Sequence, residues 1–541
     1  MRRYEHNSIC KQVLVVARRI RFCMALMWFA NITHPSKGEK KSGPNPKRDA
    51  VRFAYMNFKR KQSTTKQTMK ELTREEYDKR AQGATHVAVF KEFLADRETP
   101  VAALSRLEEA EEAFLLESVA GGDTRGRYSY LGIEPHMRIE GAAALDELKA
   151  RFAKIRYTRA PELPSFQGGA VGYIAYDAVS LFEPRVRLKD EPNTPKMAFL
   201  VCDAFLVFDN VRGTVTIAVI ADTAQSDGYD NAVKRIGAIY ERILSAESIA
   251  RVVQKKRPAA GAAPATSFVP EMSREEFCEV VAKCKKAIHD GEVIQIVPSQ
   301  KFTAKSQVSA LSLYRALRMI NPSPYNFFMK VGAKTLIGSS PEELVKLEGR
   351  SASTAPIAGT RPRGATPLED LQFERELKSD EKENAEHVML VDLARNDLGR
   401  VSETASVTVE DFAHIERYSH VMHLVTNVRS TLAKNFGAID LVKSVFPAGT
   451  LSGAPKVRAM ELIAEYEKSP RGIYGGAAGY FSLTGDMDLA IVIRTLVKEG
   501  ENLVMRSGAG IVADSDASKE YDETINKAKA VFDAVNFAEG L

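Results

Sequence analysis

The chain has 541 residues, enough for two domains, and its 44% hydrophobic and 27% charged residues are ordinary for a globular protein. The most apolar run, residues 13–32, is interrupted by Arg18, Arg19 and Arg21, so we expect no membrane span. Five cysteines without a CxxC pair argue against a disulfide framework and against a zinc site. We therefore expect a cytoplasmic protein that does not bind membranes.

The formal net charge of +6 is distributed unevenly. Residues 1–70 contain 17 basic and 3 acidic residues, whereas the rest of the chain contains 59 and 67. The body is mildly acidic, which argues against nucleic-acid binding by the whole chain. The segment 1–70 could be a targeting peptide, a nucleic-acid arm or an extension upstream of a true start at Met56 or Met69. We favour a dispensable extension, disordered or non-native.

Residues 71–253 predict a first domain made mainly of strands. A helix running into a strand is expected at 104–119, and a strand, a turn and a second strand at 127–141. The apolar runs 198–210 and 213–221 predict a hairpin, and 228–252 have helical periodicity.

Residues 254–272 are rich in Ala, Pro, Gly and Lys and predict an interdomain linker. The second domain, 273–541, begins with Ser273 followed three residues later by Glu276, the pattern of a helix capping box. Its strands and long helices do not alternate regularly, which favours an α+β fold over a doubly wound sheet.

Two predicted helices carry pairs of glutamates three residues apart. Glu383 and Glu386 lie in DEKENAEHVMLVDLARNDLGR, and Glu520 and Glu523 lie in SKEYDETINKAKAVFDAV. Residues at this spacing share a helix face, so four carboxylates could face each other and hold one Mg²⁺ ion. The alternative is a solvated helix surface, because the same spacing occurs elsewhere in the chain without such a context.

Other residues near the C-terminus suggest an anion pocket. Gly508, Ala509 and Gly510 follow a predicted strand, where small residues expose backbone N–H groups. Arg494 stands alone among apolar residues in a predicted strand and needs an anionic partner. Tyr474 stands next to Gly475 and Gly476, and Lys456 follows a turn of Gly, Ser and Pro residues. Together these residues predict a site for a small dianion.

A set of long motifs in a fixed order resembles the chorismate-utilising enzyme family. The resemblance extends over about residues 75–541, and its motifs are PIAGTRPRG, DEKENAEHVMLVDLARNDLGR, YSHVMHL, FPAGTLSGAPK, YGGAAGYF, IVIRTL and SGAGIVADSD. It implies a β-sandwich core with helices packed outside. It also implies that the N-terminal regulatory region, 71–253, packs on the chorismate-binding catalytic domain, 273–541.

The resemblance implies roles for individual residues. Glu342, in GSSPEE, would protonate the departing C4 hydroxyl of chorismate, and a closed pocket would raise its pKa for that task. His423 would support the later elimination of pyruvate, although a core histidine in a helix is the alternative, and Thr360 is implied as a further catalytic residue. Lys456 is expected near the site. The implied Mg²⁺ ligands are Glu386 and Glu523, with Glu383 and Glu520 acting through water. The implied chorismate-binding residues are Gly359, Thr360, Tyr474, Arg494, Gly508, Ala509 and Gly510.

Two residues predict the nucleophile. In relatives that make 4-amino-4-deoxychorismate, a lysine attacks C2 of chorismate, and this chain has Ala358 at that position. In relatives that add water, a lysine acts as the base, and this chain has Gln295 at that position. Water needs a base, whereas ammonia already carries a lone pair, so both differences favour ammonia. The expected products are anthranilate and pyruvate, in the first committed step of L-tryptophan biosynthesis.

The resemblance also implies partners and regulation. Ammonia is mostly protonated near neutral pH, so a separate glutamine amidotransferase subunit would supply it, in a heterotetramer of two large and two small subunits. L-Tryptophan would inhibit by binding between the domains. The implied inhibitor-binding residues are Glu117, Ser118, Pro324, Tyr325 and Asn326, and the family usually has Met in place of Asn326.

Three other functions remain open from the sequence. A different chorismate enzyme is disfavoured by Ala358 and Gln295, and a non-catalytic amino-acid sensor would have no need for Glu342 and Arg494. A basic nucleic-acid-binding protein would use residues 1–70.

Overall fold

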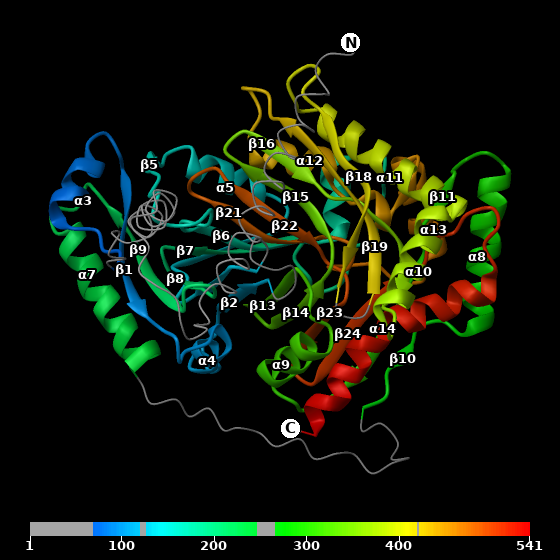
Figure 1. Cartoon of the computed structure of the whole chain (residues 1–541), viewed down its shortest axis with the longest axis horizontal. Coiled ribbons are helices and arrows are strands. Elements are labelled where there is room, and N and C mark those ends of the chain that lie inside the picture. Colours follow the sequence, from blue (N-terminus) through cyan, green and yellow to red (C-terminus); the bar gives the residue numbers. More distant parts are fainter. Residues whose placement is uncertain (1–68, 119–125, 246–265, 419–420, 541) are drawn as a thin grey trace, which may run out of the picture. The chain divides into compact units, whose positions relative to one another are not determined.

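The computed structural model describes residues 69–118, 126–245, 266–418 and 421–540 (Figure 1). They all lie in one compact unit, Met69–Leu541. Nearly all of the extension predicted at 1–70 and most of the linker predicted at 254–272 lie outside the described residues. Within the described part, no helix combines the length and the apolar composition needed to cross a membrane.

Most of the described strands join two large sheets, antiparallel throughout except for the pairing of β1 with β5. In spatial order the first sheet consists of β10 (Val269–Pro270), β12 (Ser299–Lys305), β24 (Asn502–Gly508), β23 (Thr495–Glu499), β14 (Lys334–Ser340), β13 (Tyr325–Val331), β2 (Ala113–Glu117), β3 (Tyr128–Gly132), β8 (Ala204–Asp209), β9 (Thr214–Asp222), β1 (His86–Leu94) and β5 (Tyr157–Thr158).

The second sheet runs in the order β17 (Ile357–Pro362), β19 (Val421–Thr431), β16 (Ser351–Thr354), β15 (Glu343–Glu348), β22 (Met487–Ile491), β21 (Ala477–Ser482), β6 (Gly169–Ile174), β7 (Met197–Cys202) and β4 (Met137–Glu140). In addition, β18 (Thr408–Arg417) pairs with β19, and β11 (Gln295–Ile296) pairs with β20 (Gly453–Ala454).

The two segments that the sequence suggested as separate domains share both sheets. In the first sheet β2 pairs with β13, which places Glu117 opposite Asn326. In the second sheet β6 pairs with β21. Strand edges of each segment are therefore covered by strands of the other, and the two segments interleave instead of packing as separate bodies. The expected α+β class is confirmed.

The two sheets pack against each other through aromatic side chains. The ring of Phe166 lies 6.0 Å from Phe114 and 5.0 Å from Phe205, both on the first sheet, and 5.1 Å from Tyr480 on the second. A further cluster lies where the second sheet meets helices, with Phe199 and Phe481 at 5.6 Å. The core is thus a sandwich with helices outside it, as expected.

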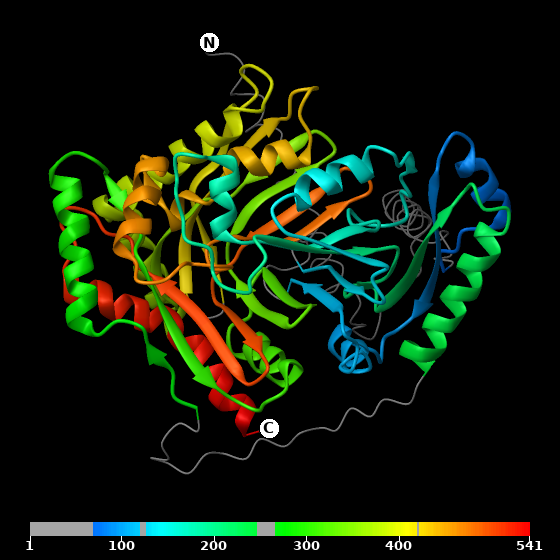
Figure 2. The same cartoon turned by 180° about the vertical axis from the view of Figure 1, so that it is seen from behind.

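Helices cover the outer faces and the ends of the sandwich. In Figure 1, α3 and α7 lie beside β1 and β9, and Figure 2 shows β12 and β24 side by side on the reverse view. The described helices are α3 (Arg74–Ala81), α4 (Pro100–Ser105), α5 (Ala144–Phe152), α6 (Val179–Phe182), α7 (Gly228–Ile239), α8 (Arg274–His289), α9 (Ala310–Ile320), α10 (Pro367–Ser379), α11 (Glu381–Gly399), α12 (Ala438–Val445), α13 (Lys456–Tyr466) and α14 (Ala517–Glu539).

The local signals in the sequence act as predicted. Ser273 caps α8: its hydroxyl accepts from the N–H of Glu276, and the Glu276 carboxylate accepts from the N–H of Ser273. The helix predicted at 228–252 begins at Gly228 and continues past Ile239 into one wider turn, Tyr240–Ser245. Cys202, Cys278 and Cys284 are free thiols.

The chain passes repeatedly from one sheet to the other. Asp203 alone connects β7 in the second sheet to β8 in the first. Pro341 and Glu342 connect β14 in the first sheet to β15 in the second, and residues 492–494 connect β22 in the second to β23 in the first. These short connections place polar residues at the junction between the sheets.

A buried ion-pair network joins β12 and β24 of the first sheet to the segment that follows α13. Glu467, which follows α13, accepts hydrogen bonds from Arg471 Nη2 at 2.6 Å, from the N–H of Ser299 at 2.7 Å and from Arg506 Nη1 at 3.4 Å. The side chains of Glu467 and Arg471 are only 3% and 1% exposed. Arg471 also donates to the backbone carbonyl of Leu451. Removing one partner would leave a buried charge uncompensated.

We therefore expect Arg471→Met to lower the free energy of unfolding by about 3–5 kcal/mol. Lys79→Met is the matched control, because the Lys79–Glu75 pair is 68% and 81% exposed and such pairs contribute less than about 1 kcal/mol. Guanidinium titration followed by circular dichroism measures both. Equal shifts in the two variants would contradict a structural role for the buried network.

Candidate active site

Two sheet-to-sheet connections run side by side and carry two of the predicted site residues, the buried Glu342 and the partly buried Arg494. The N–H of Ile491 donates to the carbonyl of Glu342 at 3.0 Å, and the N–H of Ser339 donates to the carbonyl of Arg494 at 3.3 Å. The backbone hydrogen bonds therefore hold the Glu342 connection and the Arg494 connection in a defined relative position.

Arg494 differs from the sequence expectation of a continuous strand. The apolar run is split between β22 and β23 in different sheets, and Arg494 at the split has φ +51°, in the left-handed region. The break lets its guanidinium leave the sheet, where Nη1 donates to the backbone carbonyl of Lys527 on α14. Burial lowers the pKa of Arg494, although the nearby Tyr474 and Glu523 act in the opposite direction.

Glu342 is a buried carboxyl group with one polar partner. It is 8% exposed, and its Oε1 accepts a hydrogen bond from the Thr450 hydroxyl at 3.0 Å. Burial raises the pKa of Glu342 to about 7, against smaller opposite effects of Thr450 and Lys527. A small cavity of about 40 Å³ adjoins it. Such a carboxyl group can donate a proton near neutral pH.

Gly359 is required by the geometry of its strand. It lies at an irregularity in the pairing of β17 with β19 and has φ +63°. A Cβ there would lie 2.7 Å from the Leu377 side chain and 3.0 Å from Glu383 Oε2. The glycine in STAPIAGTRPRG thus lets the strand approach the glutamate helix α11 closely.

The same irregularity orients His423 on β19. His423 Nδ1 lies 2.9 Å from the carbonyl oxygen of Gly359 and 3.1 Å from Thr360 Oγ1. Because a carbonyl only accepts, Nδ1 carries the proton and donates it, which leaves Nε2 of the neutral ring as a base. Burial lowers the pKa of His423 and so favours this neutral form. His423 lies on strand β19, so the alternative of a histidine in a helix is wrong.

The four predicted metal ligands lie on two helices, α11 and α14. Burial raises the pKa of Glu386, and the negative charges of Glu383 and Glu523 raise it further, so these carboxylates are close enough to repel one another. Glu520 is 9% exposed, and burial raises its pKa as well. Such repulsion favours a bound cation.

The four carboxylates do not form a closed metal site in this structure. Within the described residues, no three His, Cys, Asp or Glu side chains converge closely enough to hold a metal ion. Glu383 accepts from Arg361 Nη1 at 3.1 Å, and Glu523 pairs with Lys527 at 2.5 Å. The donors are hard oxygen atoms and fit Mg²⁺ chemically, but Glu383 and Glu523 would have to exchange basic partners for the ion.

Gln295 links the glutamates to the strand end at Gly510. Its Nε2 donates to Glu386 Oε1 at 3.0 Å, whereas its Oε1 is buried without a hydrogen-bond partner among the described residues. A Cβ on Gly510 would lie 3.1 Å from Gln295 Nε2, so the glycine leaves room for this amide. Gln295 thus offers an unused acceptor beside Glu386.

The small residues after β24 fulfil different roles. A Cβ on Gly508 would lie 3.1 Å from the Tyr474 hydroxyl, so Tyr474 lies against this strand end. The carbonyl of Gly508 accepts from Lys527 Nζ at 3.2 Å. Ala509 differs from the expectation of an exposed N–H: it is buried and its N–H donates to the carbonyl of Pro298 at 3.1 Å. Only the flanking glycines remain candidates for backbone contacts to an anion.

Lys527 and Thr450 were missed by the sequence analysis. Lys527 contacts the carbonyl of Gly508 and the carboxylate of Glu523, and its own carbonyl accepts from Arg494. Its position four residues after Glu523 is the spacing of a helical ion pair and could have indicated it. Thr450 shows no sequence pattern that could have indicated it.

Lys456, which the sequence analysis expected near the site, holds two helices together. Its Nζ donates to Asp397 Oδ2 at 2.6 Å and so links α13 to α11.

The predicted inhibitor residues lie together where β2 ends and β13 begins. Glu117 is buried, and its carboxylate accepts from Tyr314 at 2.6 Å and pairs with Arg318 at 2.9 Å, so it is occupied by α9. The Tyr325 hydroxyl donates to Glu343 Oε2 at 3.0 Å. Ser118 and Pro324 lie at the adjoining strand ends.

Asn326 is buried and fully engaged within the protein. Its Nδ2 donates to the carbonyl of Ser323 at 2.7 Å, and its Oδ1 accepts from the Ser339 hydroxyl at 2.7 Å. Tyr325 therefore contacts the residue next to Glu342, and Asn326 contacts Ser339, whose N–H donates to the carbonyl of Arg494.

The sequence of the chain matches known proteins over most of its length. Residues 111–533 match the family model described as chorismate binding enzyme. The chain belongs to the chorismate binding enzyme family. Anthranilate synthase component 1 of Neisseria meningitidis serogroup B is 42% identical over 87% of this chain and 99% of the relative. The protein of that name from Pseudomonas aeruginosa is 41% identical over 86% and 99%.

Solved structures agree with this family. Anthranilate synthase component I from Streptococcus pneumoniae superposes with a TM-score of 0.68 at 36% identity, over 81% of this chain and 98% of that chain. The menaquinone-specific isochorismate synthase of Escherichia coli, at 19% identity, has a TM-score of 0.64 over 90% and 100% and shows the fold alone. The expected fold is confirmed, and so is the expected kinship with enzymes of the anthranilate synthase component 1 type.

The pKa of Glu342 gives the site a direct test. We expect infrared difference spectra recorded across neutral pH to show a carboxyl group that loses its proton near pH 7. Burial also raises the pKa of Asp488 to about 7, so the Glu342 signal is the part that disappears in Glu342→Gln. Identical titrations of the native chain and the variant would contradict the assignment.

Proposed function

We propose that the chain is the large subunit of an anthranilate synthase. It converts chorismate and ammonia into anthranilate and pyruvate, requires Mg²⁺ and is inhibited by L-tryptophan. The observation that carries this proposal is the buried Glu342 carboxyl group, whose pKa of about 7 suits proton donation. Backbone hydrogen bonds hold its connection beside the connection that carries the partly buried cation Arg494. The relatives named above support the same activity.

The first step is the exchange of the C4 hydroxyl for an amine at C2. Ammonia forms a bond to C2, the ring double bonds shift, and the C4–O bond breaks. Glu342 gives its proton to the departing oxygen, so that water leaves. Arg494, Tyr474 and the flanking glycines of the strand end bind the substrate carboxylates and fix the ring against Glu342.

Two side chains favour ammonia over the other nucleophiles. Ala358 is buried on β17 and has no nucleophilic atom, so the chain cannot attack C2 itself at this position. Gln295 cannot deprotonate water, but its unpartnered Oε1 can accept a hydrogen bond from an N–H of ammonia. Both features leave the lone pair of ammonia free to attack.

The second step removes pyruvate from the amino intermediate. A proton leaves C2, the C3–O bond breaks, and the enolpyruvyl group takes up a proton and departs as pyruvate, which leaves the aromatic ring of anthranilate. His423 is the candidate base for this step, because its neutral Nε2 is free while Nδ1 is held by Gly359.

The carboxylates of α11 and α14 would hold the Mg²⁺ ion. Glu386 and Glu523 would bind it directly, and Glu383 and Glu520 through water. When bound, the ion neutralises negative charge on the substrate carboxylate next to these glutamates. The positive charge of the ion would also keep the glutamates ionised, although Glu383 and Glu523 raise the pKa of Glu386.

A glutaminase subunit, component II of the synthase, would supply ammonia in the cytoplasm. Unprotonated ammonia is scarce near neutral pH, so generating it next to the site favours attack over protonation. We propose a heterotetramer of two large and two small subunits. The chain alone then uses ammonium salts at alkaline pH, whereas glutamine supports turnover only when component II is present.

The decisive experiment measures anthranilate fluorescence from the purified chain with chorismate, Mg²⁺ and an ammonium salt at mildly alkaline pH. We expect turnover that EDTA abolishes and that excess Mg²⁺ restores. Glu342→Gln should lower kcat by about 10²–10⁴-fold, because the general acid is lost. Glu348→Gln, at an exposed position at the end of β15, the strand that follows Glu342, is the matched control and should retain the native rate.

Product analysis separates the alternatives. Isochorismate, salicylate or 4-amino-4-deoxychorismate as the main product would assign the chain to another activity of the family. Binding of chorismate without turnover would support a sensor instead. Equal rates for Glu342→Gln and Glu348→Gln would contradict the role of Glu342 as the acid.

Tryptophan inhibition is proposed to act through Tyr325. A ligand beside Ser118 and Pro324 would alter the hydrogen bond from Tyr325 to Glu343, the neighbour of Glu342. We expect Tyr325→Phe to raise the L-tryptophan concentration for half inhibition by about 3- to 10-fold, since one hydrogen bond is lost. Tyr466→Phe on α13 is the control. An unchanged inhibition curve in Tyr325→Phe would contradict this route.

A further inference from the structure

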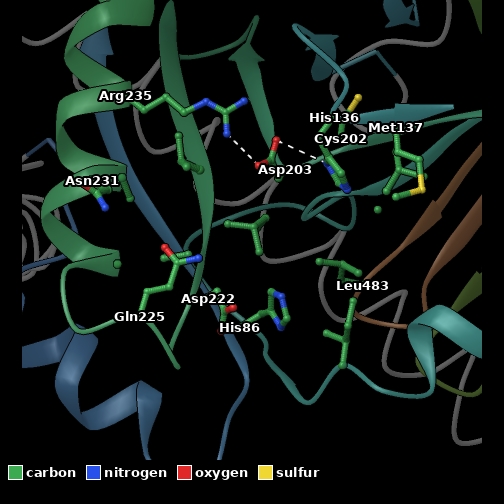
Figure 3. A pocket seen from close by; sticks show the side chains of 18 of the residues that line it. His86, His136, Met137, Cys202, Asp203, Asp222, Gln225, Asn231, Arg235 and Leu483 are labelled. Atoms are coloured by element: carbon green, nitrogen blue, oxygen red, sulfur yellow. Dashed lines mark hydrogen bonds and ion pairs between the residues drawn. The ribbon is translucent and has the colours of Figure 1, made fainter.

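A second cavity lies in the N-terminal part of the described chain, away from every residue predicted for catalysis or inhibition. Its volume is about 380 Å³, within the range of small-molecule sites. One wall is formed by β1, β9 and α7, and the other by α5 and the beginning of β4 (Figure 3). No residue of the candidate active site lines it.

Asp203 occupies the corner of this cavity. It is the single residue that carries the chain from β7 to β8, so its backbone is held in both sheets. Its Oδ2 accepts from Arg235 Nη1 at 2.7 Å, and Figure 3 shows the carboxylate between Arg235 and His136. The anchored turn gives the carboxylate a defined direction.

One oxygen of this carboxylate is unsatisfied. Oδ1 of Asp203 is buried and has no hydrogen-bond partner among the described residues. His136 Nδ1 lies 3.7 Å away, within reach of an ion pair when the ring is protonated but beyond hydrogen-bond distance. A buried acceptor without a donor is costly, and a ligand that brings an N–H group would satisfy it.

The remaining polar groups balance this negative corner. Asp222 at the end of β9 adds a second carboxylate, and Arg235 and Arg151 add two positive charges. Asn231 and Gln225 lie at exposed positions of the lining and offer amide groups. The polar lining therefore presents two anionic and two cationic side chains, of which Asp203 and Arg235 are paired with each other through Oδ2 of Asp203.

Apolar side chains form the rest of the lining. Met137 comes from β4, and Phe152 and Ile155 come from the end of α5 and the residues after it. Ile220 of β9 and Leu483 complete the apolar lining. A ligand that fits must combine a donor, an anionic group and an apolar body.

We propose that this cavity is a binding site for a free α-amino acid with an apolar side chain. Its ammonium group binds Oδ1 of Asp203, its carboxylate binds Arg235 with Asn231, and its side chain packs against Met137, Phe152 and Ile155. The site is separate from the predicted tryptophan site at Ser118 and Tyr325 and goes beyond the proposed function. It would remain if the catalytic proposal failed.

The test is calorimetric titration of the full chain with L-phenylalanine and L-leucine. We expect saturable binding with a Kd of about 1 mM or tighter for at least one of them. Phenethylamine, which lacks the carboxylate, and 3-phenylpropionate, which lacks the ammonium group, should bind at least about tenfold more weakly than L-phenylalanine.

Substitutions locate the ligand. Asp203→Asn and Arg235→Gln should each weaken binding at least about tenfold. Asp227→Asn and Lys234→Gln are matched controls at exposed positions nearby that do not line the cavity, and they should bind like the native chain. Unchanged affinity in Asp203→Asn, or no saturable binding of either amino acid, would overturn the proposal.

Hydrogen exchange gives a readout that needs no variant, in case Asp203→Asn fails to fold. The amino acid should slow amide exchange in β9 and α7, residues 214–239. Protection confined to residues 113–118 and 323–331 would place the ligand at the predicted inhibitor site and overturn the proposal.

Discussion

The candidate active site depends on two neighbouring connections between the sheets. The Glu342 connection and the Arg494 connection run in opposite senses and are joined by backbone hydrogen bonds, from Ile491 to Glu342 and from Ser339 to Arg494. Neither residue can shift without disturbing strands of both sheets. The structure thereby holds a buried acid and a partly buried cation in a defined relative position, which catalysis by positioned groups requires.

Local patterns in the sequence predicted much of the site, and non-local pairing determined the rest. The spacing of Glu383 and Glu386, the Ser273 cap and the strand end at Gly508 depend on neighbouring residues, so they could be inferred directly. The sharing of both sheets by the two segments depends on pairing between distant strands, which no local pattern records. For the same reason the run around Arg494 looks like one strand, although β22 and β23 belong to different sheets.

Electrostatic balance explains why so many charged residues occur in one place. Glu386 repels Glu383 and Glu523, and Arg494 and Lys527 lie next to the same helices. A buried charge without compensation is costly. In this structure Arg361 and Lys527 supply the compensation, and a divalent cation with an anionic substrate would supply it during turnover. The pairing of Glu523 with Lys527 can therefore be understood as the resting arrangement of residues that a metal and a substrate would separate.

The cavity at Asp203 follows from the same architecture as the active site. Where the chain crosses between sheets, the strands diverge and the backbone turns, so side chains cannot fill the junction as they fill the sandwich. At Glu342 and Arg494, the junction contacts α14 through Arg494 and bears the residues proposed for chemistry. At Asp203 it stays open between α5 and α7, and the carboxylate keeps an unsatisfied oxygen. An acceptor buried at an anchored turn, facing cationic and apolar groups, is better explained by a ligand than by packing.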